Sequence, residues 1–427
     1  MKNNTTIRQS AYDKTFGSAY NKTFGILSGL TMIMVVAGHL GYDIMAVGGL
    51  FPYYSFHVPL FLFISGYFYK DAEEEHPLAY VCKKCRRLIL PYLAWNLFYG
   101  LVAQFLHTRG FTMGEEISFR TLFVTPFLHG YQFLYQYAAW FVPVLFFIEM
   151  MNLLMRLIAR RLLSRPLSKF ISALNRKHAS SESFSEEASA QKADRFLEWL
   201  YLAAGLFVGM MVVSFAIEGR VWGNYKMPGR ILFLFPCFQM GQFYRKKLEK
   251  HDTLGNFAYF AILLAFQTLL HLCCNGLSFS AVWCTSFANG PVIPYVTIVS
   301  GIVFWLRIAR LLTPAAGESR PVQYLGRNTF TVMMHHVMVF MLIKMILAGI
   351  AAHSGFCADF DFEQYHTSID YIYLVKGVEH FKMVYLAAGV LVPLLLRYLA
   401  ESIQNRLRPA QTTDASSDGP LPRRLQK

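Results

Sequence analysis

Long apolar runs alternate with short polar connections along nearly the whole chain. Each run is close to the roughly 20 residues that an α-helix needs to cross a lipid bilayer. Inside hydrocarbon every backbone N–H and C=O group must find a partner within the protein, so such runs indicate helices. The pattern predicts an all-α polytopic integral membrane protein with about ten transmembrane helices. The expected spans are Phe24–Asp43, Leu50–Tyr69, Leu88–His107, Ala138–Leu157, Phe196–Ala216, Ile231–Tyr244, Leu254–Asn275, Val292–Leu312, Thr329–Ile350 and Val384–Ala400.

Several segments fall outside these spans. Residues 119–137 are apolar but interrupted, which predicts a re-entrant or interfacial segment. Residues 164–194 are rich in Ser, Ala, Glu and Lys and cannot bury enough apolar surface to fold alone, so a flexible cytoplasmic loop is expected. The tail at 401–427 has a similar composition and is predicted to be disordered. The chain is therefore divided into a cytoplasmic N-terminal segment at 1–23, a transmembrane domain at 24–400 and this tail.

The positions of Lys and Arg along the chain determine how the net charge of +14 is interpreted. In a soluble protein such an excess would suggest a nucleic-acid partner. Here Lys and Arg gather before the first span and after every second span, while the connection between the first two spans contains neither. Cations of membrane proteins accumulate in cytoplasmic connections. We therefore expect both termini in the cytoplasm, the lipid bilayer as a partner, and no nucleic acid.

The seven cysteines show no regular spacing. Cys82 and Cys85 form one CxxC, but no second pair and no histidines at ligand spacing accompany them. The sequence therefore predicts neither a disulfide framework nor a metal site.

Two histidines lie inside the first two predicted spans. His39 stands 15 residues into the first span and His57 lies early in the second. An ionisable side chain in hydrocarbon is costly and marks a functional site by default. Histidine also titrates near neutral pH, which suits it to proton transfer. His39 is the stronger candidate, while a hydrogen bond between helices is an equal alternative for His57.

His39 shares a helix face with a polar position near the other end of its span. Ser28, Met32, Val35 and His39 follow one another in steps of three or four residues. Such steps keep residues on one face, and eleven residues make close to three turns. At about 1.5 Å per residue, Ser28 and His39 lie roughly 16 Å apart along the helix. This face is a candidate wall for a path across the membrane.

Four cations lie at the start of the third span, in the stretch KKCRRLILPYLAW. Lys83 and Arg86 are three residues apart, as are Lys84 and Arg87, so each pair occupies one face of a helix. Paired cations suit the phosphates of a polyanionic cofactor. The alternative is a cytoplasmic cluster beside anionic lipids.

Further candidates lie in the fourth and ninth spans. Glu149 is in the middle of an apolar span, where pairing with an intramembrane histidine and catalysis are both open. His335 and His336 are adjacent in the ninth span, so about 100° of helical rotation separates their side chains. Trp140 suits stacking on a sugar, although an aromatic belt at the membrane interface explains it equally well.

Six motifs follow one another along the chain. They are VVAGH ending at His39, SFHVPLFLFISGYF at 55–68, KKCRRLILPYLAW at 83–95, AAWFVPVLFF at 138–147, FPCFQMGQFYRKK at 235–247 and LGRNTFTVMMHH at 325–336. Together they resemble the signatures of the membrane-bound acyltransferase family 3, in its polysaccharide O-acetyltransferase and fucose 4-O-acetylase-like branches. The resemblance covers nearly the whole chain.

The resemblance implies an O-acetyltransferase of the inner or plasma membrane. Such an enzyme moves an acyl group from cytoplasmic acyl-CoA, usually acetyl-CoA, to a hydroxyl of a cell-envelope or exopolysaccharide glycan. For catalysis, we expect His39 as general base together with Glu149. The CoA phosphates are expected to bind Lys83, Lys84, Arg86 and Arg87. The acceptor is expected to contact His57, Trp140 and His336.

One position departs from the family pattern. The family carries a basic residue that is separated from the catalytic histidine by ten residues. In this chain Ser28 occupies that position. Lys22 and Arg86 are the candidates to replace that cation. Two other readings therefore remain: a transporter or flippase of a glycan precursor that uses the histidines as proton relays, and a non-catalytic family member. Release of free CoA thiol separates an acyltransferase from both.

Overall fold

The protein is described by a computed structural model, which places residues 21–41, 44–45, 47, 49–162, 166, 169, 186–357, 359–373 and 381–407. Within these ranges the regular structure is helical, apart from two isolated β-bridges at Val47–Leu50 and Ser280–Thr285. The predicted all-α fold is confirmed. Most of the predicted loop at 164–194, and the chain before residue 21 and after residue 407, lie outside the described residues.

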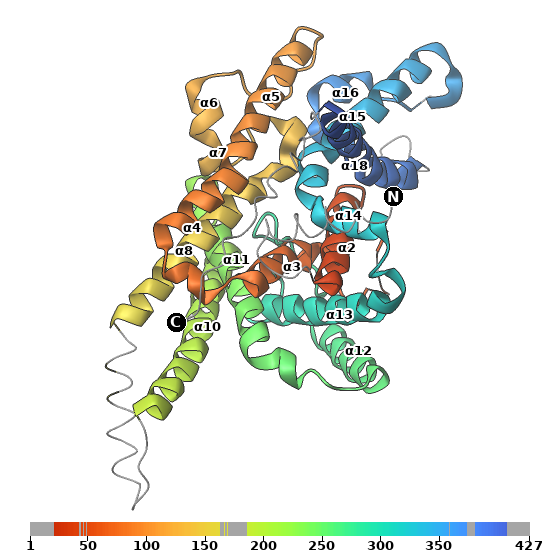
Figure 1. Ribbon diagram of the computed structural model, residues 1–427. Coiled ribbons are helices and arrows are strands. Elements are labelled where there is room, and N and C mark those ends of the chain that lie inside the picture. The colour runs from red at the N-terminus through yellow and green to blue at the C-terminus, as the bar shows by residue number, and fades with distance from the viewer. Residues whose placement is uncertain are drawn as a thin grey trace, which may run out of the picture.

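Ten helices coincide with the ten predicted spans (Figure 1). Within the described residues, seven of them are long and apolar enough to cross a membrane when their helical extensions are included. The remaining three, of 17, 16 and 18 residues, are α2, α3 and α11. The ten are α2 (Lys22–Gly38), α3 (Tyr53–Phe68), α5 (Leu90–His107), α8 (Phe141–Leu162), α10 (Glu186–Ile217), α11 (Lys226–Phe243), α12 (Asn256–Cys273), α13 (Ile293–Ala316), α15 (Thr329–His353) and α18 (Lys382–Leu407).

Most helix ends differ from the predicted span ends by at least one residue, as four examples show. α2 stops at Gly38 and α3 starts only at Tyr53, so these two helices are shorter than predicted. α10 already begins at Glu186, inside the segment predicted as a flexible loop, and α18 continues to Leu407, into the predicted tail. Amphiphilic helix ends extend beyond hydrocarbon, and hydropathy detects only the apolar part of them.

Helix α3 lies at the centre of the fold, packed against α11, α2 and α13. Two glycines allow α3 and α11 to approach closely. A Cβ atom on Gly66 would collide with the backbone carbonyl oxygen of Phe238, and one on Gly241 would collide with that of Phe63. Small residues at such contacts are what membrane helices use to bring their backbones together. The central pair is therefore held by backbone packing that a side chain would prevent.

The interrupted segment before α8 does not form a spanning helix. It folds into α6 (Phe119–Phe123), α7 (Thr125–Leu128) and the 3₁₀-helix η3 (Leu134–Trp140). The buried Asn96 of α5 holds it in place: its Nδ2 donates to the backbone oxygen of Leu122 at 2.9 Å, and its Oδ1 accepts from Gln132 and Gln136, each at 2.6 Å. This network orients the end of η3, where Tyr137 and Trp140 lie.

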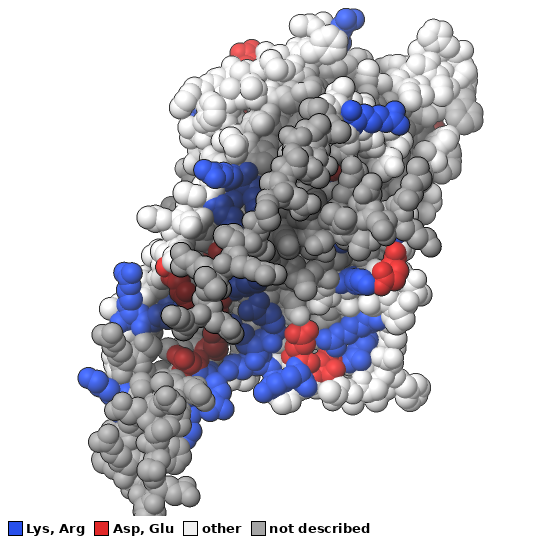
Figure 2. Space-filling view, viewed as in Figure 1, with Lys and Arg blue, Asp and Glu red and all other residues white. Residues whose placement is uncertain are grey.

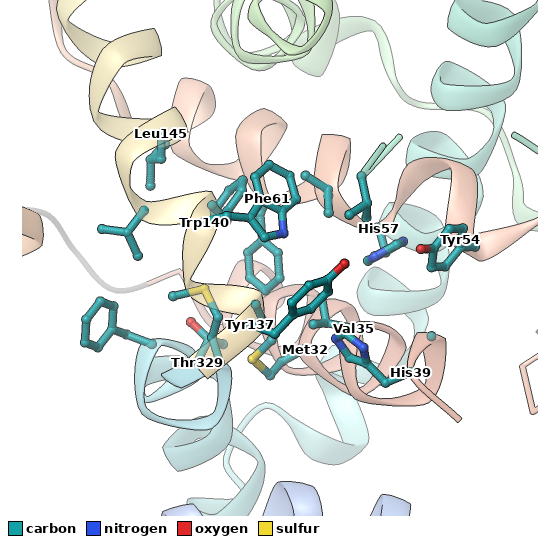
Figure 3. Close-up of a pocket in the computed structure, with 18 of the residues that line it drawn as sticks. Met32, Val35, His39, Tyr54, His57, Phe61, Tyr137, Trp140, Leu145 and Thr329 are labelled. Atoms are coloured by element: carbon teal, nitrogen blue, oxygen red, sulfur yellow. The ribbon is translucent and has the colours of Figure 1, made fainter. Parts of the chain in front are cut away.

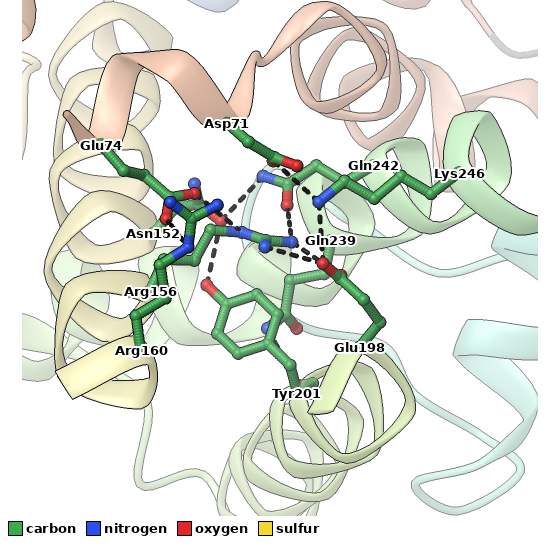
Figure 4. Close-up of polar contacts among 10 residues, drawn as sticks. All are labelled: Asp71, Glu74, Asn152, Arg156, Arg160, Glu198, Tyr201, Gln239, Gln242 and Lys246. Atoms are coloured by element: carbon green, nitrogen blue, oxygen red, sulfur yellow. Dashed lines mark hydrogen bonds and ion pairs between the residues drawn. The ribbon is translucent and has the colours of Figure 1, made fainter. Parts of the chain in front are cut away.

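A network of charged and amide side chains joins α8, α10 and α11 to the short helix η1 (Asp71–Glu74) (Figure 4). Arg156 of α8 is buried and donates to both carboxylate oxygens of Glu198 on α10, at 3.0 and 2.8 Å, and to Gln242 of α11. Lys246, just after α11, bridges Glu198 and Asp71 at 2.7 Å each. Figure 2 shows Lys and Arg side chains gathered at this end of the molecule, over the ends of α8, α10 and α11.

Candidate functional site

A cavity of about 460 Å³ lies between α2, α3, η3 and the start of α15 (Figure 3). All four residues of the predicted face on α2 line it, namely Ser28, Met32, Val35 and His39. The predicted face therefore forms one wall of this cavity. Because the face runs almost the length of α2, the cavity connects the surroundings of Ser28 with those of His39.

His39 caps the C-terminal end of α2, and three aromatic rings surround its imidazole. The ring of His336 lies 5.1 Å away between centroids, that of Tyr373 5.2 Å and that of Tyr137 6.2 Å. In Figure 3 the Tyr137 hydroxyl points into the cavity. The described part of the chain provides no hydrogen-bond partner for the ring nitrogens of His39. They are therefore open to a bound molecule.

The other two histidines have their tautomers set by the backbone. Nδ1 of His57 is 3.0 Å from the carbonyl oxygen of Tyr53, and Nδ1 of His336 is 2.8 Å from that of Val332. A carbonyl only accepts, so each Nδ1 must carry the proton, and each Nε2 then presents a lone pair. Nε2 of His336 is buried without a partner in the described structure. Its ring lies beside His39, so the structure brings His39 and His336 together.

His335 points away from this site. Its Nδ1 is 2.8 Å from the hydroxyl of Tyr99, and its ring packs edge-on against Trp95 at 4.3 Å. The two adjacent histidines of α15 therefore have different environments, as the helical rotation predicts. His336 lies beside His39, but neither it nor His335 is among the residues that line the cavity.

Aromatic side chains form the wall opposite α2. Trp140, predicted to contact an acceptor, lines the cavity together with Trp283, and Tyr131 stacks on Trp283 with 5.3 Å between ring centroids. His57 lines the same cavity, and its ring lies 5.2 Å from that of Tyr54. The structure therefore brings His57 and Trp140 to the cavity that contains His39.

Two of the four predicted cofactor cations, Lys83 and Lys84, are engaged in ion pairs. Lys84 Nζ is 2.5 Å from Oε1 of Glu149, and Lys83 Nζ is 2.6 Å from Oε1 of Glu73. The partner of Glu149 is thus a lysine and not the histidine considered from sequence. Glu149 does not line the cavity, so the structure does not bring it to His39.

The helix that carries these cations is not a regular α-helix. Between α4 (Pro77–Lys84) and α5, residues Cys85–Ile89 form a π-helix, η2, whose wider turn shifts the register assumed for three-residue spacing. Arg86 and Arg87 are exposed, and the next residue, Leu88, lines the cavity. Lys22, considered as a substitute for the family's cation, pairs instead with Glu318.

Comparison with known families decides what kind of protein holds this cavity. Residues 26–392 match the family model described as an acyltransferase domain. The chain belongs to acyltransferase family 3. Comparisons with curated proteins and with solved structures gave no match. The match includes every residue that lines the cavity of this membrane acyltransferase.

Sequence reasoning missed several residues of the acyltransferase's cavity. Trp283, Asp370 and Tyr373 come from loops or short helices far along the chain. The Tyr373 hydroxyl donates to Asp370 at 2.5 Å, and burial, then this hydrogen bond, raises the pKa of the Tyr373 phenol above its ordinary value. The phenol therefore keeps its proton at neutral pH. Hydropathy carries no signal for such positions, because loop residues have no helical periodicity to relate them to α2.

Proposed function

We propose that the protein transfers an acyl group, most simply acetyl, from cytoplasmic acyl-CoA to a hydroxyl of a cell-envelope or exopolysaccharide glycan at the inner or plasma membrane. The family supports acyl transfer in general. The observation that carries the proposal is that His39 stands, with open ring nitrogens, in a cavity that continues along α2 to Ser28. Donor and acceptor can then meet at one imidazole from two ends.

The reaction needs a base for the hydroxyl and an acid for the leaving thiolate. A ring nitrogen of His39 takes the proton of the acceptor hydroxyl while its oxygen attacks the thioester carbonyl carbon. The tetrahedral intermediate then collapses, the C–S bond breaks, and the imidazolium returns the proton to the CoA thiolate. The products are the ester and free CoA thiol. No further reactant is required.

The surroundings of His39 support this role. Tyr137 offers a hydroxyl inside the cavity, where it can donate to the oxyanion of the intermediate. The apolar lining that includes Met32, Phe61 and Leu145 keeps the site dry, which strengthens such hydrogen bonds.

The donor is assigned to the end near Ser28 and the acceptor to the end near His57. At the first end, Arg86 and Arg87 directly precede the lining residue Leu88, and exposed guanidinium groups bind phosphates well. At the other end, the indole of Trp140 suits the apolar face of a sugar. Glycan hydroxyls would thus approach His39 over an aromatic surface.

The test follows free CoA thiol and acylated product with the protein in lipid nanodiscs, acetyl-CoA and envelope glycan. A general base contributes about 10²–10⁴-fold, so His39→Ala should lower the rate by roughly 10³-fold. Tyr137→Phe should lower kcat by roughly 10²-fold with little change in KM.

His335→Ala is the matched control. Like His39→Ala, it removes a half-buried imidazole, but this one lies on α15 and contacts Trp95 and Tyr99 outside the cavity. We expect acyl transfer to continue in this variant. Thiol release that is equal in the parent and in His39→Ala would refute the proposal.

A further inference from the structure

Two buried cations lie behind the aromatic wall of the cavity. Arg230 and Lys226 occupy successive turns of α11 and are 0% and 7% exposed. The guanidinium carbon of Arg230 is 4.2 Å from the centre of the Trp140 indole, and Lys226 Nζ is 3.6 Å from that of Trp283. Both indoles line the cavity, whereas neither cation does. The two charges therefore stand one aromatic layer away from the space in front of His57.

Neither cation has an acidic partner among the described residues. Arg230 Nε donates to the carbonyl oxygen of Val282 at 2.7 Å, but both of its terminal nitrogens are buried without a hydrogen bond. Lys226 contacts the aromatic faces of Tyr131 and Trp222 in addition to Trp283. Aromatic faces compensate a cation only in part.

Two other buried cations of the described chain, Arg156 and Arg307, are paired with carboxylates. Arg156 is held by Glu198, and Arg307 is held by Asp252 at 2.6 Å. The carboxylate on the cavity wall, Asp370, is exposed and accepts its hydrogen bond from Tyr373. An uncompensated buried charge destabilises a protein, so such a pair needs a reason to persist.

We infer that the acceptor is anionic, and that Arg230 and Lys226 attract and orient its negative charge against the wall of Trp140 and Trp283. This inference rests on the proposed function, because it assigns the substrate class of that same cavity. The charged group is a carboxylate of an acidic sugar or a phosphate that links the sugar to a lipid. In both cases an oxyanion would supply the missing countercharge, with water excluded by the aromatic layer.

Binding is tested on the parent protein in nanodiscs with three probes that share a pyranose ring of glucose configuration: methyl β-glucoside, methyl β-glucuronide and glucose 1-phosphate. Intrinsic Trp fluorescence reports occupancy, since Trp140 and Trp283 form the wall. Weak screening in the dry site should make at least one anionic probe bind about tenfold more tightly than the neutral one. The glucuronide and the phosphate arms distinguish the two sources of charge. Equal affinity for all three probes would overturn the inference.

Substitutions of Arg230 and Lys226 separate the effect of their charge from that of their packing. Arg230→Met and Lys226→Met should each remove most of the preference for anions, and Arg230→Lys should retain it. Arg307→Gln is the control, because it removes a buried cation that stacks on Tyr259 far along the chain. If Arg230→Met lowered thermal stability and weakened all probes alike, Arg230 would be a structural residue and the inference would fail.

Turnover distinguishes this inference from the proposed function. Acetyl transfer that depends on His39 but runs equally well with neutral and anionic acceptors would leave the acyltransferase standing and overturn the anionic acceptor. Binding that prefers anions, together with thiol release that is independent of His39, would leave the anion preference of the cavity standing and overturn the proposed catalytic role of His39.

Discussion

The ion pair between Lys84 and Glu149 allows the predicted catalytic role of Glu149 to be tested against a structural one. The Glu149 side chain is 3% exposed and that of Lys84 is 23% exposed, with 2.5 Å between Nζ and Oε1. Lys84→Met would leave the carboxylate buried and alone, which costs about 3 kcal/mol or more. Glu149→Gln leaves a lysine that can turn toward water, at a cost of about 1 kcal/mol.

The double variant, Lys84→Met with Glu149→Gln, contains no buried charge at this place. We expect it to be more stable than Lys84→Met alone, with a coupling free energy of about 2 kcal/mol between the two positions. The assay is thermal unfolding of the purified protein in detergent, where Lys84→Met should lower Tm by roughly 5 °C. Equal Tm values for Lys84→Met and the double variant would refute the idea that the two residues stabilise one another.

Acyl transfer measured at saturating acyl-CoA completes the test. If Glu149 acts only as the ion-pair partner of Lys84, Glu149→Gln and the double variant should keep kcat close to that of the parent. If Glu149 is catalytic, both lose roughly 10²-fold or more, whatever residue stands at position 84.

Three further outcomes follow from the structure. Ser28→Arg supplies the cation that the family resemblance implies at this position. A new charge-assisted contact should then lower KM for acyl-CoA roughly tenfold, while an unchanged KM would place the donor elsewhere. Gly66→Ala should destabilise the α3–α11 contact by about 1–3 kcal/mol, measured as Tm, whereas Gly349→Ala, whose Cβ meets nothing within 4 Å, should be tolerated. Because the Tyr373 pKa is raised, its phenol stays protonated from pH 6 to about pH 9, so Tyr373→Phe should leave the shape of the pH–rate profile unchanged over that range.

The hydropathy of the chain by itself determined the fold class and the approximate place of each long helix. Runs of apolar residues must form helices in a bilayer, and the period of 3.6 residues then relates Ser28 to His39 on one face. That wall of the cavity was predictable because both residues belong to one helix. The same periodicity separated His335 from His336.

The tertiary structure alone decided what faces that wall. His57, Trp140, Trp283 and Tyr373 come from separate elements, and no local pattern relates their positions in space. It also gave Glu149 a lysine partner and placed it off the cavity, and it left Arg230 without a carboxylate among the described residues. Partners of buried charges are chosen by packing between helices, which the order of residues along one helix does not encode.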